Sequence, residues 1–194
     1  MLRLFVGIAL PEEVQVRLGM LCSGLPNARW VRPENLHMTL RFIGEVGEDV
    51  AEDVDDSLQG IRAQSFSMSL SGLGFFGNGR SPRQVWVGVE RNPLLLHLQE
   101  KIESAIVRAG LPPERRKFVP HVTLARLRGQ NVARLQSFLS VHEPFREGPF
   151  AVDCFTLFSS KLSHNGSIYR AEADYLLSSD QAPKRERVLS TEST

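Results

Sequence analysis

The sequence predicts an α+β fold made of two similar lobes, each a sheet covered by its helices. Strand-like and helix-like stretches alternate along most of the 194 residues, and the same order of elements occurs twice. The pattern His-x-Thr-Leu also occurs twice, beginning at His37 and at His121. Two copies of one supersecondary unit would pack as pseudo-symmetric lobes.

The first half alternates apolar runs with amphipathic stretches. Pro11 suits a first helical position, and Glu12 and Glu13 suit the positive end of a helix. Apolar positions at helical spacing indicate a second helix, while compact runs rich in β-formers indicate strands. We therefore expect strands over 3–10, 36–46 and 66–76, a short extended region at 30–31, and helices from residue 11 and over 49–63.

The second half repeats this order and adds a hairpin. Asn92 can cap a helix that begins at Pro93 and ends at Gly110. Another helix opens at Asn131. The expected strands cover 85–89, 118–126, 150–162 and 167–176, after a glycine-rich turn at 77–82.

These elements predict a single domain, residues 1–177, made of two repeat units at about 3–78 and 84–177. Residues 178–194 are polar and lack periodicity, so we expect a disordered tail. The apolar run at 3–10 is too short to span a bilayer and has no cleavage site after it, so we expect a cytoplasmic protein.

Composition excludes several classes of function. The formal net charge is +1, which argues against a protein that coats nucleic acid or a membrane through bulk electrostatics, but allows recognition of a single phosphate. The two cysteines, Cys22 and Cys154, cannot build a disulfide framework or a four-cysteine zinc site. We expect both to be buried in a reducing compartment.

The repeated motif carries the candidate chemistry. On a strand, residues two apart point to the same face, so His37 projects with Thr39, and His121 with Thr123. Pseudo-symmetry would bring the four side chains together in a groove. Two imidazoles can act as acid and base in one displacement near neutral pH, and threonine hydroxyls can donate to phosphate oxygens.

Two other interpretations of the histidines are weaker. Single histidines are usually structural, but a matched pair is not explained that way. A zinc site would need further ligands, and no carboxylate recurs at matching positions, so no metal is expected. The other three, His97, His142 and His164, have no repeated context and are expected on the surface or on helices.

Two arginines are candidates for holding phosphate oxygens. Arg41 lies four residues after His37, so regular alternation places it on the same face. Arg126 lies five residues after His121 and would reach that face only at a bulge or at the strand end. Regular alternation of side chains along the strand therefore favours Arg41.

Several stretches together resemble the two-histidine (2H) phosphoesterases, specifically the bacterial and archaeal RNA 2′,3′-cyclic phosphodiesterases, also described as 2′-5′ RNA ligases. The resemblance covers about residues 3–175. The stretches that carry it are 3–11, 34–40, 42–45, 81–83, 85–89 and 120–126.

The resemblance implies two antiparallel sheets lining a central groove, with helices outside, and metal-independent, cofactor-free hydrolysis of a terminal 2′,3′-cyclic phosphate to a 2′-phosphomonoester. His37 would be the general acid and His121 the general base, with Thr39 and Thr123 on phosphate oxygens. It also implies Arg126 rather than Arg41, and therefore a local strand irregularity. The expected partner is an RNA 3′ end. No protein partner is implied, so a monomer is expected.

Other functions stay open at this point. The same groove could join a 5′-hydroxyl RNA end to the cyclic phosphate, although water at about 55 M favours hydrolysis. A noncatalytic module that binds RNA ends, or a phosphodiesterase of small cyclic nucleotides, would use the same residues. Phe42, Phe76 and Tyr169 could stack on bases or belong to the core.

Overall fold

The structure, a computed structural model, describes residues 1–79, 81–129, 131–163 and 166–179. Its helices are α1 (Glu12–Gly19), the 3₁₀ turn η1 (Pro33–Asn35), α2 (Glu48–Gln59), α3 (Pro93–Arg108) and α4 (Val132–His142). Its strands are β1 (Leu2–Ala9), β2 (Ala28–Trp30), β3 (His37–Val46), β4 (Phe66–Asn78), β5 (Ser81–Val89), β6 (His121–Leu127), β7 (Arg146–Val152), β8 (Cys154–Ser163) and β9 (Gly166–Leu176). The α+β prediction is confirmed.

The strands of the described residues form one antiparallel sheet of nine strands rather than the two sheets expected. Eight follow the order β7-β4-β5-β6-β3-β1-β8-β9, and β2 pairs with β6. The two halves of the sheet join at β3 and β6 through a single residue pair, Met38 with Val122. This narrow junction joins the strands of both lobes into one continuous sheet, whereas two sheets were expected from the sequence.

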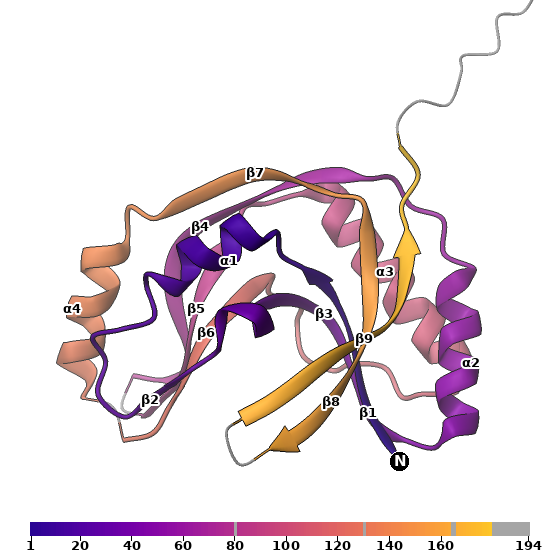
Figure 1. The fold of residues 1–194 in the computed structure, drawn as a ribbon, viewed down its shortest axis with the longest axis horizontal. Helices are drawn as coiled ribbons and strands as arrows, with labels where there is room; N and C mark the ends of the chain where they lie inside the picture. Colours follow the sequence, from indigo (N-terminus) through magenta and orange to yellow (C-terminus); the bar gives the residue numbers. More distant parts are fainter. Residues whose placement is uncertain (80, 130, 164–165, 180–194) are drawn as a thin grey trace, which may run out of the picture.

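Each half of the chain contributes to both lobes (Figure 1). The His37 lobe consists of β3, β1, β8 and β9 with helices α2 and α3, whereas the His121 lobe consists of β7, β4, β5, β6 and β2 with helices α1 and α4. Thus β4 pairs with β5 and β7, away from its own half, and β8 returns to pair with β1. The repeat units of the sequence are therefore not the lobes.

The single strand expected over 150–162 is two strands. β7 pairs with β4 in the His121 lobe, and β8 pairs with β1 in the His37 lobe. Asp153 lies between them, and its carbonyl accepts a hydrogen bond from the amide of Leu177 at 2.7 Å. The chain crosses between the lobes at this point, a change of partner that a continuous apolar run does not reveal.

The hairpin and tail predictions differ in detail. The expected turn at 77–82 is shorter, because β4 continues to Asn78 and β5 begins at Ser81. Of the expected tail, Ser178 bridges Gln64, and residues 180–194 lie outside the described residues. Nowhere in the described chain is a helix both long and apolar enough to cross a membrane.

Both motif strands carry a β-bulge at the same position. The register pairs that define them are Gly7–Thr39 and Val6–Arg41 in the His37 lobe, and Trp86–Thr123 and Val85–Ala125 in the His121 lobe. Leu40 therefore has no residue opposite it on β1, and Leu124 has none opposite it on β5. A bulge reverses the alternation of side chains beyond it. This reversal decides which residues reach the face that carries the motifs.

Candidate active site

The two histidines are held in the same way. The Nδ1 of His37 lies 2.7 Å from the carbonyl oxygen of Asn35, and the Nδ1 of His121 lies 2.6 Å from that of Val119. A carbonyl only accepts hydrogen bonds, so each Nδ1 carries the proton and donates it. Each ring therefore keeps its Nε2 for chemistry.

The junction of the lobes brings the two motifs together. Met38 and Val122 are fully buried in the core and paired in antiparallel register. The residues on either side of them point to the opposite face, and the antiparallel register places each histidine across from the other motif's threonine. We call this side, which carries His37, Thr39, His121 and Thr123, the motif face.

Burial sets the charge state of both rings. It lowers the pKa of His37 below the ordinary imidazole value, and a charge on His121 lowers it further, against the opposing hydrogen bond to Asn35. Burial also lowers the pKa of His121, against its hydrogen bond to Val119. Both rings are therefore mostly neutral at pH 7, and they lie close enough to influence each other.

Gln84, which sequence reasoning missed, belongs to the same cluster. Its side-chain amide donates to the hydroxyl of Thr123 and lies 3.5 Å from the Nε2 of His121. The free Nε2 of a neutral ring is an acceptor, so the amide nitrogen suits both neighbours. Because Gln84 lies on β5 opposite Arg126, only the strand register places it here.

Aromatic rings surround His37. Ring centroids of Phe5, Tyr169 and Phe158 lie 4.7, 5.0 and 6.0 Å from that of the imidazole. These three rings provide the apolar surroundings that desolvate the histidine. Tyr169, a base-stacking candidate from the sequence, packs edge-on against the catalytic candidate itself.

His121 lies against two rings. Phe76 packs edge-on with a centroid distance of 4.8 Å, and Trp86 lies at 6.0 Å. A Cβ built on Gly74, the residue opposite Trp86, would lie 2.3 Å from the indole ring. Glycine at this position therefore leaves the space that the indole occupies beside the histidine.

Arg126 lies on the motif face, as the resemblance implied. The bulge at Leu124 reverses the alternation, so Ala125 is buried and Arg126 is exposed. On β5 the cross-strand partner of Arg126 is Gln84, whose side chain contacts Thr123, so Arg126 points to the same side as Thr123. The strand irregularity expected from the resemblance is present.

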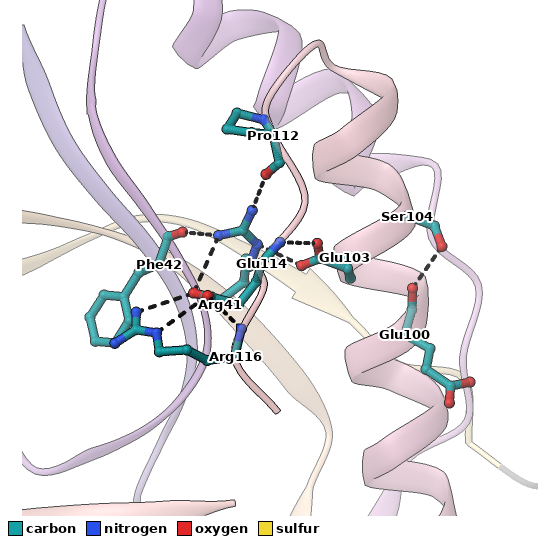
Figure 2. A network of polar contacts seen from close by, with 8 residues as sticks. All are labelled: Arg41, Phe42, Glu100, Glu103, Ser104, Pro112, Glu114 and Arg116. Carbon is teal, nitrogen blue, oxygen red and sulfur yellow. Dashed lines mark hydrogen bonds and ion pairs between the residues drawn. The ribbon is translucent and has the colours of Figure 1, made fainter. Parts of the chain in front are cut away.

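Arg41 lies on the opposite face, so the parity prediction is wrong for this residue. The equivalent bulge at Leu40 turns Arg41 toward the helices, where its side chain is 9% exposed. Its Nε lies 2.6 Å from the carboxylate of Glu103 on α3 (Figure 2). Phe42 takes the place on the motif face and is 57% exposed. An ion-paired, inward guanidinium is not available to a phosphate.

Arg41 instead joins β3 to the segment that leads into the second motif. Its guanidinium donates to the carbonyls of Phe42 and Pro112, each at 2.6 Å, and lies 4.0 Å from the carboxylate of Glu114 (Figure 2). Hydrogen bonds from Arg116 hold the pKa of Glu114 at about 2. Arg41 is thus a structural residue of the His37 lobe.

The described residues contain no group of three histidine, cysteine, aspartate or glutamate side chains that could hold a metal ion. Two imidazoles, two hydroxyls, an amide and a guanidinium converge on the motif face. Such a set can transfer protons and hold an anion with neutral and cationic donors.

The fold and these residues define a two-lobed α+β protein with a duplicated histidine–threonine motif on one face of its sheet. A family model described as LigT like Phosphoesterase matches residues 8–86 and again 87–169, one match for each repeat. The chain belongs to this family of phosphoesterases.

Curated relatives and solved structures agree with this assignment. A protein of Aeropyrum pernix named RNA 2′,3′-cyclic phosphodiesterase is 39% identical over 76% of this chain and 85% of its own length. A protein of Thermotoga maritima with the same name is 34% identical over 87% of this chain and 92% of its own length. The crystal structure of E. coli LigT complexed with 3′-AMP superposes with a TM-score of 0.74 at 26% identity, covering 91% of this chain and 98% of that one.

Proposed function

We propose that the protein hydrolyses the terminal 2′,3′-cyclic phosphate of RNA to a 2′-phosphomonoester, with His37 as general acid and His121 as general base. The observation that carries this is the paired orientation of the imidazoles: each donates from Nδ1 to a backbone carbonyl, which leaves Nε2 as the nitrogen available for proton transfer on the motif face. The names of the relatives support the choice of substrate.

In the proposed reaction His121 Nε2 takes a proton from water as the water oxygen bonds to phosphorus. The bond from phosphorus to the ribose 3′-oxygen breaks, and His37 gives its Nε2 proton to that oxygen. Thr39, Thr123 and Arg126 hold the non-bridging oxygens, where negative charge grows. The ring protons then re-equilibrate with solvent, so the cycle needs no metal ion and no cofactor.

The direct test is turnover under chelation. The full chain, with excess EDTA, is incubated with a short RNA ending in 2′,3′-cyclic phosphate, and products are separated by chromatography and identified by mass. We expect a 2′-phosphate product alone. Binding without turnover would support the noncatalytic module, and hydrolysis confined to cyclic mononucleotides would support the small-nucleotide enzyme. A 5′-hydroxyl RNA added to the mixture tests the reverse ligation, which we expect to be minor.

The pH dependence follows from the lowered pKa values. The reactive form needs His37 protonated and His121 neutral, and burial lowers both pKa values below 6.5. Because kcat/KM follows the free enzyme, it should peak below about pH 6.5 and fall about tenfold per pH unit above neutrality. Glu114, with a pKa of about 2, stays ionised throughout and does not contribute. A maximum above pH 8 would contradict the assignment.

A further inference from the structure

A second arginine lies beside Arg126 on the motif face. In the register of β2 with β6, Arg29 is directly opposite Arg126. Residues directly opposite each other in an antiparallel pair point to the same face, with Cβ atoms about 5 Å apart. The next residue, Trp30, packs on Phe138 of α4, so Arg29 must point away from the helices.

Two like charges in this position work against folding. Like charges directly opposite in a sheet are destabilising, and both arginines are exposed. Among the described residues neither has an ion pair, although Arg17, Arg41, Arg116 and Arg146 do. Anions bound by the two guanidinium groups would offset their repulsion.

A comparison of the ligand's phosphates with the arginines of the site indicates what Arg29 would bind. A terminal cyclic phosphate carries one negative charge, and the proposed function already gives it Thr39, Thr123 and one arginine. A second guanidinium beside Arg126 therefore matches a second phosphate on the same ligand. A cyclic mononucleotide has no second phosphate, whereas an RNA strand has one at every nucleotide.

We propose that Arg29 binds a phosphodiester of the RNA strand other than the reacting phosphate, which makes an oligonucleotide end, rather than a cyclic mononucleotide, the preferred substrate. The juxtaposition of Arg29 and Arg126 on the motif face carries this assignment, and it rests on the proposed function. Phosphate contacts by arginine are the usual source of affinity for nucleic acid.

The test compares two substrates across three variants. Wild type, Arg29→Gln and Arg29→Lys are assayed on a five-nucleotide RNA ending in 2′,3′-cyclic phosphate and on a 2′,3′-cyclic mononucleotide. We expect Arg29→Gln to lower kcat/KM about tenfold on the RNA and less than twofold on the mononucleotide, with Arg29→Lys retaining most activity. The slope of log kcat/KM against log salt should shrink by about 0.7 for the RNA.

The control is Arg108→Gln, an exposed arginine on α3 at the helical side of the sheet, which removes the same charge and should leave both activities unchanged. Arg29→Gln should also leave the melting temperature unchanged or slightly raised, because a repulsion is removed. Equal losses on both substrates, or no loss on the RNA, would overturn the inference.

Failure of the proposed function is separable from failure of this inference. If the wild type hydrolyses neither substrate, fluorescence anisotropy with a labelled five-nucleotide RNA ending in 2′-phosphate still measures the second site. Weaker binding by Arg29→Gln than by Arg108→Gln would support it, and equal binding would contradict it.

Discussion

His37→Ala and His121→Ala should each lower kcat by about three orders of magnitude, because a positioned proton donor or acceptor raises the rate by about 10²–10⁴-fold. Single-turnover assays on a cyclic-phosphate RNA measure the loss, and circular dichroism checks that the variants fold. His97→Ala is the matched control, because His97 is exposed on α3. Near-wild-type activity in either variant would refute the two-histidine mechanism. The double variant should lose little more than either single one, because the two groups act in one step.

A substrate with sulfur in place of the 3′-oxygen separates the two roles. Thiolate is a good leaving group without protonation, so His37→Ala should hydrolyse this substrate at least about tenfold faster than the oxygen substrate. The same substrate should give no rescue of His121→Ala, because the water must still lose its proton. Rescue of His121→Ala alone would reverse the assignment of acid and base.

Methionine at Arg41 and at Arg126 should have opposite effects. Arg41→Met leaves the carboxylate of Glu103 without its cation, and this carboxylate is only partly exposed, whereas Glu114 keeps its ion pair with Arg116. We expect a loss of about 2 kcal/mol in the free energy of unfolding, or about 4–8 °C in melting temperature. Its kcat/KM, measured well below the melting temperature, should stay within about threefold of wild type.

Arg126→Met should instead keep the melting temperature and lower kcat/KM about 100-fold, the usual cost of removing one donor to developing negative charge. Thermal unfolding and steady-state kinetics on both variants decide the matter. A stable but inactive Arg41→Met would mean that the phosphate is held from the other face of the sheet.

These two arginines also show how far the sequence predicts the site. The repeated motif placed four side chains on one face, because residues two apart on a strand share a face. Arg41 was misplaced because a bulge adds one residue without changing composition. The second motif did carry a signal: Leu124 and Ala125 are consecutive small or apolar residues before Arg126, which strict alternation does not explain. Arg41 in the first motif is equivalent to Ala125 in the second, which the apolar sequence places in the core. Alignment of the two copies therefore predicts that Arg41 points inward.

Other features depend on pairing between distant strands. Gln84 and Arg29 reach the motif face through the registers of β5 and β2 with β6, and no local pattern around either residue indicates this. The local sequence of β4 and β8 also does not indicate that these strands belong to the lobe of the other half, because each strand is apolar whichever strand it pairs with. Most helices and strands were predictable from the sequence, whereas the partner of each strand in the sheet was not.

The two copies of the motif have diverged in their surroundings. Phe5 lies opposite Phe42 in the His37 lobe, where the His121 lobe has Gln84 opposite Arg126. His37 thus has aromatic rings beside it, whereas His121 has an amide and a cation nearby in addition to the rings of Phe76 and Trp86. The two copies of the motif therefore give their histidines different neighbours.

The exchanged strands have a consequence for how such a site can be specialised. If two separate identical chains built this sheet, every side chain at their junction would occur twice, and no change could affect one histidine alone. A single chain that supplies both copies has no such constraint. Because each half also lends a strand to the other's lobe, neither half can separate and take its histidine with it. Covalent continuity thus permits the two histidines to differ in their surroundings, while the interlocked strands keep both motifs at the same junction.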